Sequence, residues 1–242
     1  MREPGFIGLR QARRITPPSA TLLSGFYSML VAFLGAMIAV DNASACQICV
    51  PLPIQTMTDR LLDSDAVVLA REDPQRPYHY AALNTLKGDP STVAIDLFMN
   101  TRVRRYLTAD PTSAMLLARD PRGGEWRMLG ITHGDFERVV RRILSFEGEW
   151  IPKETDNLER LREMAPLLGN KDTRLHELAF LEIGRASYES IKSISANVSL
   201  QRVRAMLSDP RYIEWRGLDI LLLGLSDAKQ DRARVIREME DR

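Results

Sequence analysis

The spacing of apolar residues changes near Trp150, and this change restricts the fold of the 242-residue chain more than any other feature. Before it, five short segments combine apolar residues with partial alternation of apolar and polar positions, which is typical of β-strands. These segments are residues 66–70, 78–86, 93–98, 114–119 and 125–129. The turn-forming sequence Asp120-Pro121-Arg122-Gly123-Gly124 joins the last two and predicts a hairpin. Five short strands predict a small barrel or a sandwich.

After Trp150 the apolar residues recur at helical spacing up to the C-terminus. Asp172 is a typical N-cap for a helix that ends at Gly184, and Asp209-Pro210 begins a second pattern that ends at Gly224. The two ends lie about 40 residues apart, which is the period of HEAT-type helical repeats. Shorter helices are expected between them, at residues 188–194 and 200–207. The predicted fold class is therefore α+β.

One amphipathic helix is expected between these two parts. Its apolar residues fall at i, i+3, i+4, i+7 and i+8, with arginines on the opposite side. They are Phe136, Val139, Val140, Ile143 and Leu144. We expect this stripe to be a packing face.

An uncharged segment, Thr21–Val40, stands between four basic residues and the small-residue sequence Ala43-Ser44-Ala45. This order predicts an export signal that is cleaved between Ala45 and Cys46. The signal would be longer than the usual 15 to 30 residues or so. Three explanations stay open: a twin-arginine leader using Arg13 and Arg14, a start codon assigned too far upstream, and an uncleaved anchor, because about 20 apolar residues suffice to cross a bilayer. A buried core helix is the fourth interpretation of the segment.

Charge excludes two classes of partner. Residues 1–45 contain four basic and two acidic residues, so their removal leaves 29 basic against 30 acidic residues. A chain so close to neutral offers no electrostatic footprint for nucleic acid or for an anionic membrane surface. Contact with a membrane is expected only if residues 21–40 remain as an anchor. The predicted location is otherwise periplasmic or secreted.

Cys46 and Cys49 are the two cysteines of the chain, and their spacing has four interpretations. A structural disulfide suits an oxidising compartment. A redox dithiol requires a helix directly after the pair, whereas Pro51 and Pro53 favour extended chain. A metal site requires four ligands, and the other candidates, His79, His133 and His176, belong to different predicted elements. In the fourth interpretation, an N-terminal Cys46 binds a metal on a partner.

Other catalytic patterns are broken or missing in the sequence. His176 and Glu177 begin like the zinc-protease signature His-Glu-x-x-His, but Phe180 occupies the position of the second histidine. We therefore predict His176 to be a surface or repeat-interface residue. The acidic residues of the helices are predicted to lie on solvated faces or to pair with arginines one turn away. Arg102, Arg104 and Arg105, with Tyr106 beside them, are predicted to lie in an exposed loop.

The C-terminal part resembles a pair of degenerate HEAT-like repeats. The resemblance is carried by Asp172, Leu175, Ala179, Ile183-Gly184, Asp209-Pro210, Arg216 and Leu223-Gly224. His176 stands where the family usually has arginine, and Asp219 stands where it usually has alanine. Helical repeats supply binding surfaces, so the resemblance implies a scaffold or a binding protein.

Residues 46–131 are similar to the netrin-like, tissue-inhibitor-of-metalloproteinase-like modules that begin some exported bacterial proteins. Cys46, Cys49, Asp65-Ala66-Val67-Val68 and Lys87-Gly88 carry this similarity. It implies a short helix, a first strand at Asp65 and an OB-like barrel. It also implies inhibition through the amine and thiol of Cys46, although the inhibitors have the spacing Cys-x-Cys and this chain has Cys-x-x-Cys.

These inferences together predict four segments: a signal peptide or anchor at 1–45, an OB-like domain at 46–131, a linking helix at 132–150 and a HEAT-like domain at 151–242. The leading hypothesis is a non-enzymatic binding or scaffold protein of the cell envelope, with a protein partner and no cofactor. The alternatives are a metalloprotease-inhibitor-like protein acting through Cys46, and a thiol redox or metal-handling protein using Cys46 and Cys49.

Overall fold

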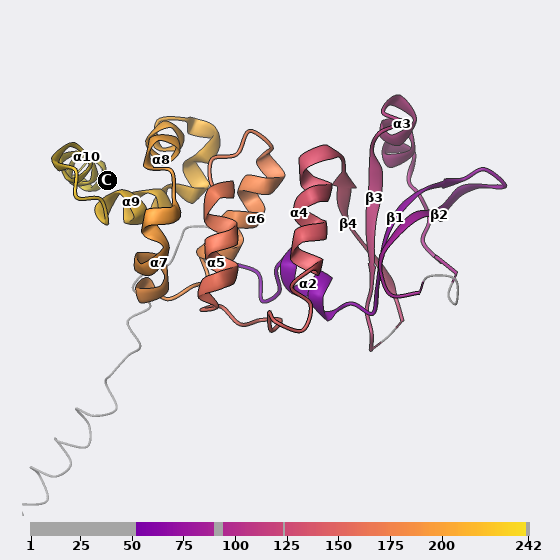
Figure 1. The fold of residues 1–242 in the computed structure, drawn as a ribbon. Coiled ribbons are helices and arrows are strands. Elements are labelled where there is room, and N and C mark those ends of the chain that lie inside the picture. Colours follow the sequence, from indigo (N-terminus) through magenta and orange to yellow (C-terminus); the bar gives the residue numbers. More distant parts are fainter. Residues whose placement is uncertain (1–51, 90–93, 123, 241–242) are drawn as a thin grey trace, which may run out of the picture. The chain divides into compact units, whose positions relative to one another are not determined.

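A computed structural model of the protein describes residues 52–89, 94–122 and 124–240, which form a small antiparallel sheet followed mainly by helices (Figure 1). The predicted α+β class is therefore confirmed. The predicted signal or anchor at residues 21–40, the cleavage site at Ala45 and the cysteines Cys46 and Cys49 lie outside the described residues. No described helix combines the length and the apolar character that a bilayer crossing requires.

Four strands form the sheet in the spatial order β2-β1-β3-β4, and every neighbouring pair is antiparallel. They are β1 (Ala66–Asp73), β2 (Arg76–Lys87), β3 (Ala114–Arg119) and β4 (Trp126–Thr132). The predicted hairpin is confirmed as β3 and β4. β2 and β4 are the two edges, so the described strands form an open sheet and no closed barrel. The pairing of β1 with β2 is irregular and contains three register shifts.

The third predicted strand, residues 93–98, does not join the sheet in its described part. Residues 94–98 contribute an isolated bridge between His79 and Phe98. A helix that the sequence did not predict follows, α3 (Thr101–Ala109), because the side-chain oxygen of Asn100 accepts a hydrogen bond from Val103 N at 2.9 Å and caps it. The three arginines at positions 102, 104 and 105 therefore lie on a helix, and the prediction of a loop was wrong.

Both faces of the sheet are covered at its two central strands, β1 and β3. Residues 66–70 of β1 are all buried, although alternate side chains of a strand point to opposite faces. Val67 and Leu69 join the core cluster under the C-terminal helices, whereas the alternate residues of β1 join a second cluster that includes Leu107 of α3. A strand that is buried on both faces has a continuous apolar sequence, which explains the imperfect alternation of this segment.

Arg71 at the end of β1 holds the segment that follows α3. Its guanidinium donates hydrogen bonds to the carbonyl oxygens of Pro111, at 2.6 Å, and Ser113, at 2.7 Å. It also donates to the carbonyl oxygen of Leu107 in the last turn of α3. The carbonyls at the end of a helix have no partner within the helix, so a cation at this position stabilises it.

The remaining elements are mostly short helices, and most of them follow β4 (Figure 1). They are α2 (Met57–Asp63), α4 (Gly134–Leu144), α5 (Leu158–Met164), η2 (Ala165–Leu167), α6 (Thr173–Ile183), α7 (Tyr188–Ile194), η3 (Ser195–Asn197), α8 (Leu200–Leu207), η4 (Pro210–Trp215), α9 (Arg216–Gly224) and α10 (Lys229–Glu240), where η denotes a 3₁₀ helix. The predicted caps are confirmed, because Asp172 accepts a hydrogen bond from Arg174 N and Asp209 accepts one from Arg211 N. The predicted helices at 188–194 and 200–207 are present as α7 and α8.

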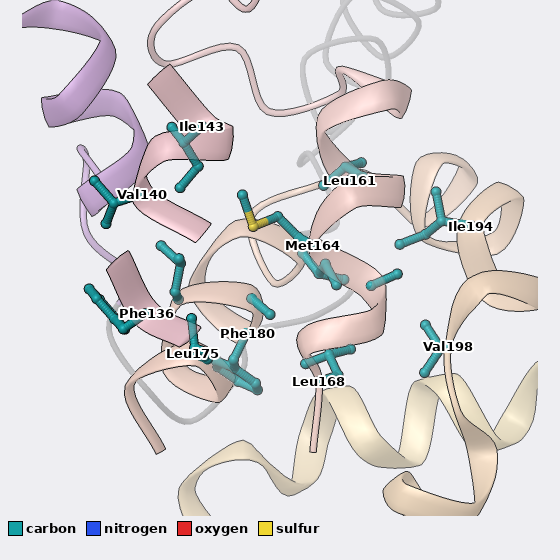
Figure 2. Close-up of a cluster of buried hydrophobic side chains, with 14 of the residues drawn as sticks. Phe136, Val140, Ile143, Leu161, Met164, Leu168, Leu175, Phe180, Ile194 and Val198 are labelled. Atoms are coloured by element: carbon teal, nitrogen blue, oxygen red, sulfur yellow. The ribbon is translucent and has the colours of Figure 1, made fainter. Parts of the chain in front are cut away.

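The main hydrophobic core joins the sheet to these helices. Phe136, Val140 and Ile143 of α4 are at most 1% exposed, which confirms the predicted packing face. Figure 2 shows these three side chains in one cluster with Met164 of α5 and Phe180 of α6. Because β1, α4, α5 and α6 contribute to the same cluster, the sheet and the helices share a core.

Two arginines and two carboxylates form a buried ion network between α2, α5 and α6. Arg160 lies 2.8 Å from Asp59 and 2.6 Å from Glu182. Arg185 lies 2.9 Å from the other oxygen of Asp59 and 3.6 Å from Glu182. All four side chains are at most 8% exposed. The charges therefore balance inside the protein, at two positive and two negative.

Backbone donors also bind this buried ion network, at Asp59. Asp59 accepts hydrogen bonds from Lys153 N at 2.8 Å and from Thr56 N at 3.0 Å. Burial by itself would raise the pKa of Asp59, but these hydrogen bonds and the one from Arg160 outweigh it and lower the pKa to about 2. The carboxylate is therefore ionised at neutral pH. The acidic residues of the helices were predicted to lie on solvated faces or to pair with arginines one turn away. This is wrong for Asp59, which is buried and pairs with distant arginines, whereas Glu182 is buried but also pairs with Arg185 one turn away.

Candidate binding groove

A groove lies in the helical part, between the loop 169–173, α8 and η4. It consists of two adjoining depressions that share Met206, Asp209 and Tyr212 in their walls. The first, about 370 Å³ in volume, is bounded by the loop 169–173 and by α8, and we call it the cationic depression. The second, about 260 Å³ in volume, is bounded by α8 and η4, and we call it the apolar depression. The chemical contrast between its two depressions makes this groove the candidate site.

Local sequence signals form both rims of the groove. In the loop, Asn170 accepts a hydrogen bond from Asp172 N at 2.9 Å, and Asp172 in turn caps α6. On the other rim, Asp209 caps η4 and Pro210 occupies its first turn, where a missing N–H costs nothing. On each rim, a side chain therefore accepts a hydrogen bond from a backbone N–H of the same rim and holds the local conformation.

Gly169 permits the close approach of the loop to α8. Its φ angle is +70°, in the region that favours glycine, and a Cβ atom at this position would lie 2.7 Å from Cβ of Arg202. That separation is well inside van der Waals contact. A larger residue would therefore displace Arg202, which lines the cationic depression.

Positive charge exceeds negative charge in the cationic depression. Lys171, Arg202 and Arg211 line it together with Asp209. Arg211 is paired with Asp209 at 2.6 Å, and this arginine side chain is 80% exposed. Within the described residues, no carboxylate lies within ion-pair distance of Lys171 or Arg202. Two positive charges in the depression are thus left without a negative counterpart from that part of the chain.

The apolar depression differs in chemistry. Half of its lining residues are apolar: Met206, Leu207, Pro210 and Ile213. Met206 and Leu207 are at most 8% exposed, whereas Ile213 is 62% exposed. Arg216 also lines it, but its guanidinium forms an ion pair with Glu238 of α10. Exposed apolar side chains next to a concave wall are suited to the burial of an apolar group.

His176 lies beside the groove and is 1% exposed. Its ring stacks on Trp215 with a centroid separation of 4.2 Å and meets the ring of Tyr212 edge-on at 5.0 Å. Its Nδ1 accepts a hydrogen bond from Gly169 N at 2.9 Å. Burial lowers the pKa of His176 to about 4, so the ring is neutral at pH 7. The side chain of His176 therefore connects Gly169, through its hydrogen bond, to η4, through its contacts with Tyr212 and Trp215.

His176 is not the surface residue that was one of its two expected positions, because it lies in a buried contact between α6 and η4. Phe180, at the position of the missing zinc ligand, stacks on Trp215 at 4.7 Å. His79 is on β2 and His133 precedes α4, so the structure does not bring the three histidines together. Among the described residues, no group of three or more potential ligands is placed to hold a metal ion.

Asp219 of α9 is a second buried ionisable residue in this part, 2% exposed, and its Oδ2 has no hydrogen-bond partner among the described residues. Burial raises its pKa to about 7. His176 and Asp219 are the two positions at which the chain departs from the HEAT-like pattern that it resembles. The sequence thus indicated that both residues are unusual for that pattern, but it did not indicate that they are buried.

The groove itself was not predicted. Its residues belong to segments that the sequence identified as caps and helix ends, and a depression between them depends on how α6, α8 and η4 pack. The chain was also compared with protein-family models, with curated proteins and with solved structures, and no match was found in any of the three comparisons. The function is therefore inferred from the groove.

Proposed function

We propose that the protein is an exported, non-enzymatic binding protein of the cell envelope, and that it binds a protein partner in the groove of its helical part. One observation carries the proposal. The cationic depression, about 370 Å³ in volume, contains Lys171 and Arg202 without a carboxylate partner among the described residues. Unpaired cations at a concave surface favour an oppositely charged partner.

The surroundings of the groove support binding rather than chemistry. The imidazole of His176 lies next to the groove, yet it is enclosed, and its Nδ1 already accepts a hydrogen bond from the N–H of Gly169. A general base must reach a proton of the substrate. This imidazole therefore helps to hold the groove in shape and does not take a proton from a ligand.

The proposal retains the two resemblances. Helix α2 followed by β1 from Ala66 has the order of a short helix and a first strand, as the inhibitor-like modules do. Helices α6 and α7, and then η4 with α9, begin at residues expected for HEAT-like units. An experimental structure of the full chain tests both points, and a helical part without successive antiparallel pairs would remove the repeat assignment.

Site-specific photocrosslinking in producing cells tests the binding function. A photoreactive side chain replaces Ile213, 62% exposed in the groove, or Ile236, 56% exposed on α10. We expect one crosslinked adduct from position 213, none of the same mass from position 236, and loss of the adduct when Lys171→Glu and Arg202→Glu are added. Equal labelling at both positions, or an adduct that survives the charge reversal, would overturn the proposal.

Cell fractionation with intact-mass analysis tests the location and the N-terminus. A chain that begins at Cys46 and is found in the envelope fraction supports export. A full-length chain in the cytoplasm would contradict it. The same mass shows whether Cys46 and Cys49 are joined, because a disulfide lowers the mass by two hydrogens.

A further inference from the structure

We propose that the groove recognises an acidic peptide segment in which a carboxylate stands next to a bulky apolar residue. This inference rests on the proposed binding function and specifies its ligand. It follows from the contrast between the two depressions. One is lined by cations without acidic partners among the described residues, and the other has an apolar lining that includes the exposed Ile213.

The two depressions are close enough for neighbouring residues of one segment. They share Met206, Asp209 and Tyr212, so the wall between them is a few side chains thick. In an extended peptide each residue advances the chain by about 3.3 Å. Adjacent or next-but-one side chains of the same peptide can therefore occupy both depressions.

The side chain of Arg202 is held in a position that suits the binding of a carboxylate. Its Nη1 donates to the carbonyl oxygen of Pro166 at 3.2 Å, which holds the guanidinium in place. The Nε and Nη2 donors remain, and this edge matches the two oxygens of a carboxylate in a bidentate pair. Lys171 adds a point charge on the same depression. Because the guanidinium of Arg202 is partly fixed before binding, ordering it costs less free energy when a carboxylate binds.

A peptide fits the groove better than a nucleic acid. Binding to nucleic acid requires a basic surface that extends over several phosphates and aromatic faces on which bases stack. Tyr212, the aromatic side chain shared by both depressions, is engaged edge-on with His176. The apolar depression also offers Met206 and Ile213, which suit an aliphatic or aromatic side chain of a peptide.

Selection from phage-displayed random heptapeptides on the full protein tests this inference, at an ionic strength of about 0.1 M, where surface charges still act over about 10 Å. We expect enriched peptides to place aspartate or glutamate next to leucine, phenylalanine or a similar residue. Binding of a synthetic enriched peptide, measured by fluorescence anisotropy, should weaken at least about tenfold in the double variant Lys171→Gln/Arg202→Gln, as expected for the loss of charge-assisted hydrogen bonds.

Matched controls distinguish the effect of cations in the groove on peptide affinity from the effect of cations elsewhere on the surface. Lys192→Gln on α7 and Arg237→Gln on α10 remove exposed cations outside the groove and should leave peptide affinity unchanged. Replacing the acidic residues of the peptide by their amides should weaken binding as much as the double variant does. Inorganic phosphate at millimolar concentration should compete weakly, since it cannot fill the apolar depression.

Two results would overturn the inference. One is enrichment of peptides without acidic residues, and the other is equal affinity of the double variant. If the crosslink from Ile213 persists while acidic peptides fail to bind, the ligand assignment falls and the binding function stands. If the crosslink itself is missing, the binding function falls.

Discussion

The buried ion network and the groove both gather arginines from separate helices, yet they differ in how the charges are balanced. In the network, Arg160 and Arg185 face Asp59 and Glu182, and all four are at most 8% exposed. In the cationic depression, Lys171 and Arg202 have no acidic partner among the described residues and are exposed. The comparison teaches that charge balance, and not the number of charges, separates a structural cluster from a candidate binding surface.

The physical reason is the cost of removing a charge from water. A buried ion that loses its partner keeps the full desolvation penalty, whereas an exposed cation is hydrated and gains when an external anion approaches. A balanced network is thus expected to be sensitive to mutation through stability. An unbalanced groove is expected to be sensitive through binding.

The largest effect is expected for Arg160→Met, which leaves Asp59 and Glu182 with one cation between them. Breaking a buried pair costs about 3 to 5 kcal/mol of unfolding free energy. Urea denaturation followed by circular dichroism measures it. Arg142→Met is the matched control, because Arg142 also pairs with a glutamate but is 55% exposed, so its loss should change the urea midpoint far less. Equal losses in the two variants would contradict the distinction between buried and exposed pairs.

His176 and Asp219 extend the comparison, because they are buried ionisable residues that have no ion partner among the described residues. Between pH 3.8 and about 7, the native Asp219 keeps a proton that the unfolded chain has released, so this residue makes stability fall as pH rises. Between about pH 4 and 6.5, the unfolded His176 binds a proton that the native ring lacks, so this residue makes stability rise with pH. The two slopes oppose each other over the shared window.

We therefore expect the unfolding free energy to vary little between about pH 5.5 and 6.5 in the unmodified protein, above the range in which carboxylates with a lowered native pKa, such as Asp59, take up protons in the unfolded chain. Asp219→Asn should unmask a rise with pH, and His176→Phe should unmask a fall, each by up to about 1.4 kcal/mol per pH unit. Urea denaturation across this pH range measures both slopes. Asp135→Asn, at a carboxylate that is 67% exposed, serves as the control and should keep the flat profile. Slopes of the same sign in the two variants would refute the opposite contributions assigned to His176 and Asp219.

Gly169→Ala tests whether the groove is held by a steric fit. The added Cβ meets Arg202 at 2.7 Å and the backbone keeps a positive φ, so we expect a loss of about 1 to 3 kcal/mol. Gly148→Ala is the matched control, because its φ is +86° but its Cβ would have no neighbour within 4 Å. Thermal unfolding compares the two variants, and peptide affinity should decrease only in the first. A smaller loss at position 169 than at 148 would contradict the steric account.

The smallest effect on stability is expected in the groove itself. Lys171→Gln and Arg202→Gln remove hydrated cations that have no acidic partner among the described residues, so the urea midpoint should stay within experimental error. The same two substitutions should weaken peptide binding. A marked loss of stability in either variant would mean that the residue has a structural role, like the residues of the buried ion network, and would contradict its assignment to the binding surface.

Local signals predicted much of the helical part correctly. Asp172 caps α6 as expected, and residues 188–194 and 200–207 are helical as the apolar spacing indicated. Asp209 caps η4, but the pattern expected to continue from it to Gly224 is divided into η4 and α9. These features depend on contacts within a few residues, which a sequence pattern records. The packing face of α4 was predictable for the same reason.

Features that depend on distant contacts were missed. Arg160 looks like any charged residue of an amphipathic helix, and it is buried because Asp59, about a hundred residues earlier, reaches it. The strand expected at residues 93–98 has suitable residues, but strand formation depends on a partner, and its described part makes one isolated bridge. The groove depends on three elements that meet only in the folded chain. In each case the information lies in the packing, which local spacing does not encode.

The irregular pairing of β1 with β2 bears on solubility. β2 is an edge strand of 12 residues, long enough to serve as a template for another copy of the chain. Three register shifts interrupt its pairing with β1, and such bulges bend and twist a strand. A twisted edge does not offer the straight row of amide and carbonyl groups that intermolecular strand addition requires. The same irregularity that shapes this hairpin therefore protects the protein from edge-to-edge aggregation.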